Sequence, residues 1–178
     1  TIEVSIISLA AATLIGIIVG LVNTSKSKSV IMRILKVIAN LYINIIRGTP
    51  MLVQILIIYF GLGQMLRPTG FRWLNIGGTF TAGTVALSLN AGAYMAEIVR
   101  GGIEAVDKGQ IEAARSLGLT YSKTMKKIVL PQALRTMLPS IINQFIISIK
   151  DTSLLSVIGL AELTNVGKTI AATQSAHM

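Results

Sequence analysis

Few residues of this 178-residue sequence have the types and spacing that catalysis requires. The chain has no cysteine, so it offers no thiolate nucleophile, disulfide or thiolate metal site. Its single histidine, His177, is next to last, and we assign it no role. The sequence contains no metalloprotease signature, nucleophile elbow or pair of catalytic acids. It therefore predicts neither a catalytic site nor a metal site.

One short segment resembles part of a nucleotide site. Gly167-Lys168-Thr169 matches the end of a phosphate-binding loop, whose backbone amides and lysine hold phosphate groups. That loop requires a glycine at position 162, where the sequence has Glu162. We therefore expect no ATP, magnesium or other cofactor to bind this chain itself.

Polar residues within the apolar stretch 80–106 could instead contact a substrate that crosses the membrane. Polar groups inside a membrane span are costly and normally face a cavity or a partner. Ala82, Ala86, Asn90 and Tyr94 share one helical face, and we expect this face to line a translocation path. Glu97 and Arg100 follow at a spacing of three. For these two, an internal ion pair is the preferred interpretation.

A second polar group lies at 150–153. Here we expect helical structure to be interrupted at membrane depth, which is tolerated where the backbone is buried in protein or faces water. Asp151 could bind the ammonium of an amino acid, while the hydroxyls of Thr152 and Ser153 or backbone amides bind its carboxylate. Thr49, beside Pro50, could hold another irregular stretch near the path, although a simple kink explains it equally well.

The composition indicates that lipid surrounds the elements that carry these residues. Of all residues 52% are apolar and 13% charged, and the mean hydropathy is +0.71. Soluble domains carry about 25% charged residues. The net charge of +9 comes from basic residues gathered between apolar runs, a pattern typical of loops beside membrane spans. We therefore expect an all-α, multi-pass membrane protein in the bilayer and no nucleic-acid partner.

The apolar runs predict one domain, 1–178, with spans at approximately 4–22, 36–65, 80–106 and 128–149. A re-entrant segment is expected at 151–165. Segment 26–36 has four basic residues and segment 108–127 has five. The positive-inside rule therefore places both segments in the cytoplasm and the N-terminus outside.

Two helical faces have patterns that predict their packing. Small residues recur every fourth position in the first span, which allows another helix to approach closely; they are Ser8, Ala12, Gly16 and Gly20. Packing within one subunit is favoured over a dedicated dimerisation face. Segment 30–47 has one polar stripe, so this helix either lies at the membrane surface or, the preferred interpretation, begins the second span. The stripe contains Arg33, Lys36, Asn40, Asn44 and Arg47.

The loop at 107–125 has the sequence pattern of a defined short helix. We expect a helix over 110–117, ended by Gly118 in the left-handed conformation, with Thr120 or Ser122 capping the next helix. An isolated helix of this length is marginal in water. Its presence therefore favours a docking surface for a cytoplasmic partner, although the residues alone leave an ordinary loop equally open.

Resemblance decides between these alternatives. Glu112-Ala113-Ala114, Gly118 and 128–131 (Ile-Val-Leu-Pro) resemble the EAA motif of binding-protein-dependent ABC importer permeases. The similarity extends to the polar amino-acid uptake branch of that family at 47–54, 94–103, 130–135 and 150–154.

The resemblance implies a type I ABC importer permease fold in the bacterial cytoplasmic membrane. The EAA helix of that family is the coupling helix, which here implicates Glu112, Ala113, Ala114, Gly118 and Leu119. The implied partners are a pair of ATPase subunits that bind ATP and magnesium, a second permease subunit, an extracytoplasmic substrate-binding protein and a polar amino acid. Homodimer and heterodimer stay open. The chain departs from the family pattern by lacking the fifth span and the usual residues before the first.

An ion-coupled secondary amino-acid carrier is the alternative. It would use intramembrane acids such as Glu97 and Asp151 as coupling sites. The short length, the absence of internal repeats and the EAA loop all favour the ATP-driven importer.

Overall fold

The computed structural model describes residues 1–25, 27, 29–160, 166–167, 169–170 and 172, and every regular element within these ranges is a helix. The expected all-α class is thus confirmed. The α-helices are α1 (Ile2–Thr24), α2 (Val30–Arg47), α3 (Met51–Leu56), α4 (Gly63–Met65), α5 (Gly78–Glu104), α6 (Lys108–Ser116), α7 (Tyr121–Thr124) and α8 (Leu130–Asp151). Between or after them lie the π-helical segments Ile57–Leu62 and Met125–Val129 and the 3₁₀ segments Arg67–Thr69, Trp73–Ile76 and Thr152–Ile158.

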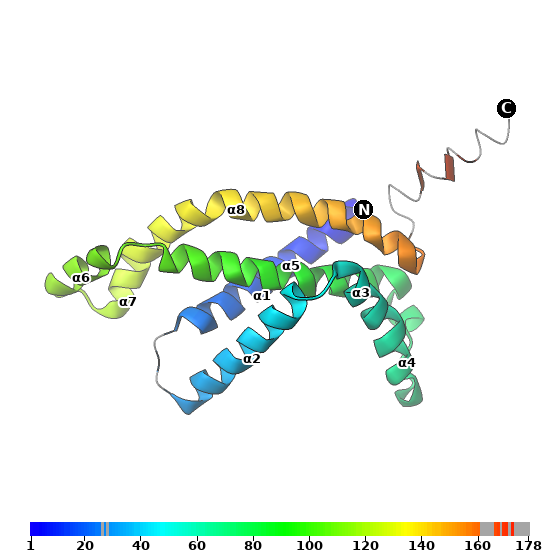
Figure 1. Ribbon diagram of the computed structural model, residues 1–178, viewed down its shortest axis with the longest axis horizontal. Helices are drawn as coiled ribbons and strands as arrows, with labels where there is room; N and C mark the ends of the chain where they lie inside the picture. Colours follow the sequence, from blue (N-terminus) through cyan, green and yellow to red (C-terminus); the bar gives the residue numbers. More distant parts are fainter. Residues whose placement is uncertain (26, 28, 161–165, 168, 171, 173–178) are drawn as a thin grey trace.

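Helix α5 is the central element. It runs along the length of the molecule and packs against α1, α2, α3 and α8 (Figure 1). Much of its surface is buried alanine and glycine, which lets several neighbours approach its backbone at once. Every other long helix is therefore positioned with respect to α5.

The small-residue face of α1 packs against α5 within the same chain, as predicted. All four residues of that face are buried. A Cβ atom added at Gly16 would lie 2.3 Å from the Cβ of Met95, and one at Gly20 would lie 2.7 Å from the Cβ of Val99. Only glycine allows this distance between the two backbones.

The single span expected over 36–65 is divided in the structure. Helix α2 ends at Arg47, and the helical stretch Met51–Met65 continues at 109° to it. Thr49 is disfavoured in a helical conformation because it precedes proline, and Pro50 has no N–H to donate to the preceding turn. The bend expected at 48–50 is therefore present, and it is large enough to separate two elements.

The helix that begins at Tyr121 continues to Ile158. At Asp151 it narrows from an α-helix to a 3₁₀ helix, so the break in helical structure expected at 150–153 is not observed. The chain has neither glycine nor proline there until Gly159, which takes a φ of +80° and ends the helix. Of the re-entrant segment expected at 151–165, residues 161–165 lie outside the described residues.

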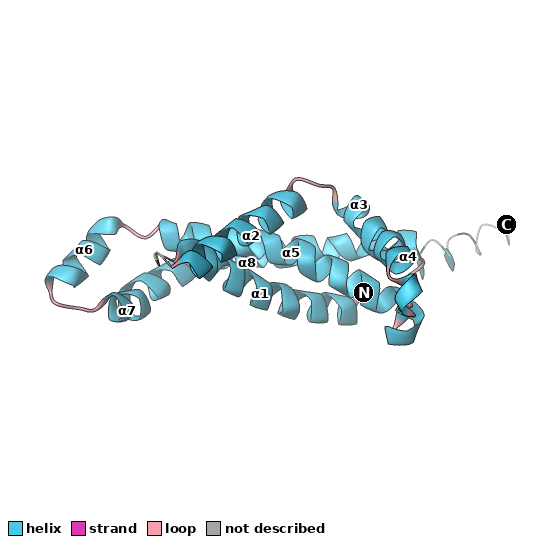
Figure 2. Ribbon diagram, turned by 90° about the horizontal axis from the view of Figure 1, so that it is seen from below, coloured by secondary structure: helices cyan, strands magenta, loops and turns pink. Residues whose placement is uncertain are grey.

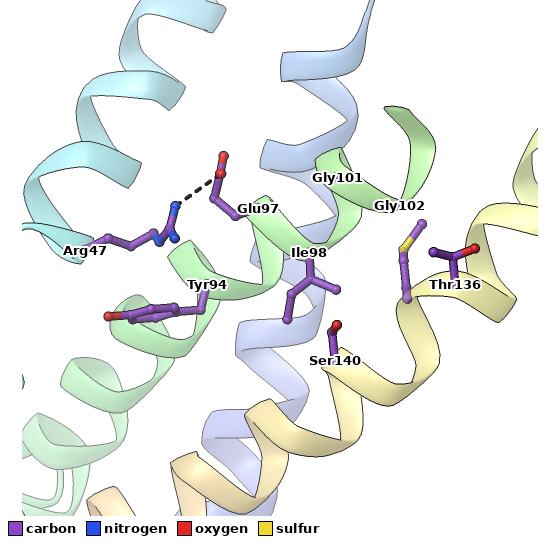
Figure 3. Close-up of a pocket in the computed structure, with 9 residues that line it drawn as sticks. Arg47, Tyr94, Glu97, Ile98, Gly101, Gly102, Thr136 and Ser140 are labelled. Atoms are coloured by element: carbon purple, nitrogen blue, oxygen red, sulfur yellow. Dashed lines mark ion pairs between the residues drawn. The ribbon is translucent and has the colours of Figure 1, made fainter. Parts of the chain in front are cut away.

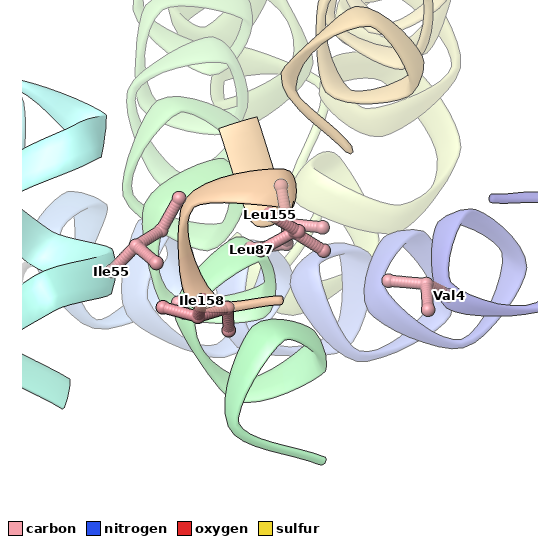
Figure 4. Close-up of a cluster of buried hydrophobic side chains, with 6 residues drawn as sticks. Val4, Ile55, Leu87, Leu155 and Ile158 are labelled. Carbon is pink, nitrogen blue, oxygen red and sulfur yellow. The ribbon is translucent and has the colours of Figure 1, made fainter. Parts of the chain in front are cut away.

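Two apolar clusters hold the ends of the bundle together. One joins α1, α3, α5 and the 3₁₀ segment after α8 through Val4, Ile55, Ala86, Leu87, Leu155 and Ile158 (Figure 4). The other joins the ends of α5 and α8 that lie nearest α6, through Val99, Ile103, Val106, Val129, Ala133 and Met137. The second cluster fixes the base on which α6 and α7 rest.

By length and apolar composition, α1 and the helix Tyr121–Ile158 are able to cross a membrane, and the bent pair α2 and Met51–Met65 makes a third candidate. Among the described helices α5 does not meet this test. Its glycine, alanine, serine and asparagine residues lower its hydropathy because they face other helices instead of lipid.

Gly16→Leu should lower the unfolding temperature of the purified protein in detergent. The added side chain must push α1 away from Met95, and overpacking costs roughly 1–3 kcal/mol. Gly61→Leu is the matched control, because Gly61 is exposed and a Cβ there would have Cγ2 of Ile57 as its nearest neighbour, at 3.8 Å. Circular dichroism during heating measures both variants. Equal unfolding temperatures would show that the α1–α5 contact is not a determinant of the fold.

Candidate functional site

Helix α6 has defined caps at both ends. Asp107 Oδ1 accepts a hydrogen bond from the backbone N–H of Gly109 at 2.5 Å. At the other end Gly118 has a φ of +80°, and the N–H of Leu119 donates to the carbonyl of Ala114 at 3.1 Å, as in a Schellman motif. The hydroxyl of Thr120 then accepts from the N–H of Lys123 and caps α7. The predicted helix end at Gly118 is thus confirmed.

The two alanines of α6 face opposite ways. Ala114 is buried against this chain, while Ala113 and Glu112 are exposed. Leu117 is 84% exposed, an unusual position for a large apolar side chain in a well-capped turn. The surface open to a partner is therefore Glu112, Ala113 and Leu117, which we call the α6 face. Leu119, half-buried, lies beside it.

This segment projects from one end of the molecule. In Figure 2, α6 and α7 lie beyond the ends of the long helices, at the end opposite α4. Ile111 of α6 and Met125 pack against the apolar cluster that joins α5 to α8. Helix α6 is therefore connected to both long helices by apolar packing.

A group of charged side chains connects α2 to α5. Glu97 Oε2 lies 3.1 Å from Arg47 Nη1, and its two oxygens accept from Nε and Nη2 of Arg100, each at 2.9 Å. Arg100 also pairs with Glu104 at 2.5 Å. The predicted ion pair of Glu97 and Arg100 is confirmed, and the structure adds Arg47. The guanidinium carbon of Arg47 lies 5.3 Å from the centre of the Tyr94 ring, within cation–π range.

A buried amide holds the corner between α2 and α3. Gln54 Nε2 donates to the carbonyl of Ile46 at 2.7 Å, and to the carbonyl and the hydroxyl of Thr49 at 3.0 and 2.9 Å. Its Oε1 accepts from Asn90 Nδ2 at 2.9 Å. Asn90 is 5% exposed, so the structure places it, with Ala82 and Ala86, in the packing around α5.

The polar group at 150–153 is not brought into contact with these residues by any described bond. Asp151 is the last residue of α8 and is partly buried. Thr152 is 1% exposed, and its hydroxyl donates to the carbonyl of Ile149 at 2.7 Å. The carbonyl of Ser153 accepts from the hydroxyl of Ser156 at 2.8 Å. The Thr152 hydroxyl is thus already paired within its own helix.

Residues 12–176 match a family model described as binding-protein-dependent transport system inner membrane component. The match covers well over half of the chain. The chain belongs to this family. Its members are components of a transport system, so the expected membership of the binding-protein-dependent importer permeases is confirmed.

Curated relatives of this permease include the glutamine transport system permease protein GlnP of Escherichia coli K12, 44% identical over 97% of this chain and 74% of that protein. The arginine transport system permease protein ArtQ of Bacillus subtilis strain 168 is 40% identical over 92% of this chain and 69% of that protein. These relatives favour an ABC permease over an ion-coupled carrier.

Solved structures confirm the fold of the permease. The crystal structure of an amino acid ABC transporter with histidines superimposes with a TM-score of 0.83 at 39% identity, covering 97% of this chain and 75% of that chain. The MetNI methionine ABC transporter, at 21% identity, has a TM-score of 0.71 and shows the similarity of fold alone.

Two residues of the permease make contacts that the sequence did not assign, and the exposure of a third was not predicted from the sequence. Gln54 lies in the matched segment 47–54, but its partner Asn90 is 36 positions away. Arg47 was one of five residues in a polar stripe, without a particular partner. Leu117 could have been singled out from the sequence, because it directly precedes Gly118, where the helix ends and the chain changes direction.

Gln54→Leu should destabilise the permease by about 1–3 kcal/mol, because the carbonyl of Ile46 and the amide of Asn90 lose their partner in a buried setting. Gln64→Leu, at an exposed glutamine, should stay within about 0.5 kcal/mol. Thermal unfolding in detergent measures both.

The double variant with Asn90→Leu should recover part of the loss, since both members of that pair become apolar. Strictly additive losses would contradict a direct Gln54–Asn90 interaction.

Proposed function

We propose that this chain is the transmembrane subunit of an ATP-driven importer of polar amino acids. It forms part of the translocation path and couples to a separate ATPase subunit. The observation that carries the proposal is the α6 face, a capped and exposed surface fixed to two long helices by an apolar cluster. The names of the relatives GlnP and ArtQ support an amino-acid substrate.

The coupling mechanism is mechanical. The ATPase subunit binds ATP and magnesium, and its closure moves the surface on which α6 is docked. Since Ile111 and Met125 pack on the ends of α5 and α8, this movement reaches the helices that line the path. ATP binding thereby favours one arrangement of the spans over the other, which is the thermodynamic requirement for driving transport.

The complete importer contains further components. A second permease subunit, identical or related, lies beside this one, and an extracytoplasmic binding protein delivers the amino acid. Within this chain we propose that Tyr94 and the cavity beside it form part of the path. Thr49 belongs to the corner between α2 and α3, which positions Arg47. Asp151 and Ser153 stay proposed path residues at the far end of α8.

The positions of the charged residues support a proposed orientation in the membrane. The chain's N-terminus and α4 lie toward one end in Figure 1, and α6 and the start of α2 lie toward the other. Lys36 of α2 and Lys108 of α6 line the same cavity, so basic residues of both predicted cytoplasmic segments lie near α6, which supports the position of this end in the cytoplasm. The N-terminus is then outside.

Leu117→Asp should abolish copurification of the ATPase subunit and the ATP hydrolysis that the binding protein stimulates, because a charge replaces the apolar group at the centre of the α6 face. Leu74→Asp is the control: Leu74 is 83% exposed and lines a cavity together with Gly63 and Gln64 of α4, and α4 lies at the opposite end of the molecule from α6 (Figure 1). It should retain the ATPase subunit. Normal copurification of the ATPase subunit with the Leu117→Asp variant would contradict the assignment of α6 as the coupling helix.

Single cysteines test the orientation, since the chain has none of its own. Leu74→Cys should react with a membrane-impermeant maleimide in intact cells, whereas Ser122→Cys on α7 should react only after permeabilisation. Both positions are exposed, so the difference reports the side of the membrane. The reverse labelling pattern would contradict the proposed topology.

A further inference from the structure

A cavity of about 400 Å³ lies between the end of α2, the second half of α5 and the first half of α8 (Figure 3). Arg47, Tyr94 and Glu97 line one wall, and the hydroxyl residues Thr136 and Ser140 of α8 lie across from them. Sites for small molecules have volumes of roughly 300–1,000 Å³. The cavity is therefore large enough for one amino acid, and it presents a positive and a negative charge together.

A glycine leaves part of this cavity open without being required for packing. A Cβ added at Gly101 would meet nothing within 4 Å, although Gly101 lines the cavity. The adjacent Gly102 differs, since a Cβ there would lie 2.2 Å from Cγ of Met137. Gly102 thus allows α5 and α8 to pack closely, while the missing side chain of Gly101 leaves room in the cavity.

The bond between Arg47 and Glu97 can open without isolating either charge. When it opens, Arg47 keeps its position over the Tyr94 ring, and Glu97 keeps both hydrogen bonds from Arg100. The two side chains are 41% and 24% exposed, so a ligand in the cavity reaches them. A buried pair without such second partners would strongly resist separation, because an uncompensated charge in a low-dielectric interior is expensive.

The charges of the cluster also balance. Arg47 and Arg100 are positive, Glu97 and Glu104 are negative, and their sum is zero. A ligand that enters this cluster without adding net charge must be neutral or carry one charge of each sign. An α-amino acid has both an ammonium and a carboxylate and therefore meets the requirement.

On these grounds we infer that the Arg47–Glu97 pair is a subsite for the two charged groups of a zwitterionic amino acid. The α-carboxylate replaces Glu97 on Arg47, and the α-ammonium replaces Arg47 on Glu97. When Arg47 and Glu97 pair again, they displace the amino acid from the subsite. This inference rests on the proposed function, and it adds a position where the backbone groups common to all α-amino acids are bound, whatever the side chain.

Binding of tritiated L-glutamine and L-arginine to the purified permease–ATPase complex, without the binding protein, tests the inference. The double variant Arg47→Gln/Glu97→Gln keeps hydrogen-bonding side chains but removes both charges. Its affinity should fall roughly 10- to 100-fold, as expected for losing charge-assisted hydrogen bonds. Arg33→Gln changes an exposed arginine of the same helix outside the cavity and should stay within about twofold.

Two further measurements do not depend on the charge variants. Gly101→Leu should fill the cavity and abolish binding while the complex still assembles, as judged by size-exclusion chromatography. The methyl ester and the N-acetyl derivative of each amino acid lack one charge and should compete at least tenfold more weakly than the amino acid.

Wild-type affinity in the double variant or in Gly101→Leu, or equal competition by both derivatives, would overturn the subsite. Undetectable binding to a wild-type complex that is active in uptake would overturn it as well. Failure of the proposed function has a different signature: the wild-type complex, with its binding protein, would then show no ATP-dependent uptake of any amino acid.

Discussion

The close approach of α1 to α5 is the contact on which the other positions depend. Gly16 and Gly20 bring the two backbones so near that a single Cβ would collide with Met95 or Val99. In lipid, apolar side chains gain little by avoiding the solvent, so helices associate through close packing and internal hydrogen bonds. The small residues of α5 allow the same approach by α2, α3 and α8 on its remaining sides. The permease is thus organised around one helix whose own hydropathy is modest.

Because α5 is central, it connects the proposed coupling surface on α6 to the proposed substrate residues. Ile103 in its last turn belongs to the apolar cluster on which Ile111 of α6 packs, and Glu97 and Arg100 lie within the two preceding turns. Arg47 approaches from α2, whose end is held by the bonds from Gln54 to Thr49. The proposed coupling therefore predicts that a movement of α6 changes the distance between α2 and α5 at the ion pair. Opening that pair is inexpensive, since each charge has a second partner.

Local features were predictable from the sequence, whereas features that depend on distant partners were not. Gly118 as a helix end and the small face of α1 follow from the chemistry of a few neighbouring residues. The bond from Asn90 to Gln54 joins positions 36 apart, and no periodicity indicates it. Ala114 was expected at a partner's surface but is buried in its own chain, and the residues adjacent to it in sequence do not reveal which contacts bury it. The break in helical structure expected at 150–153 is absent, because the chain has neither glycine nor proline there.

The central claim is that ATP, and no ion gradient, drives amino-acid import through this subunit. Uptake of radiolabelled glutamine and arginine into proteoliposomes that contain the complete complex, with its binding protein and with ionophores present to abolish ion gradients, tests it most directly. The account predicts accumulation that requires ATP on the side of α6 and continues without any gradient. Accumulation that disappears with the gradient and is indifferent to ATP would contradict it.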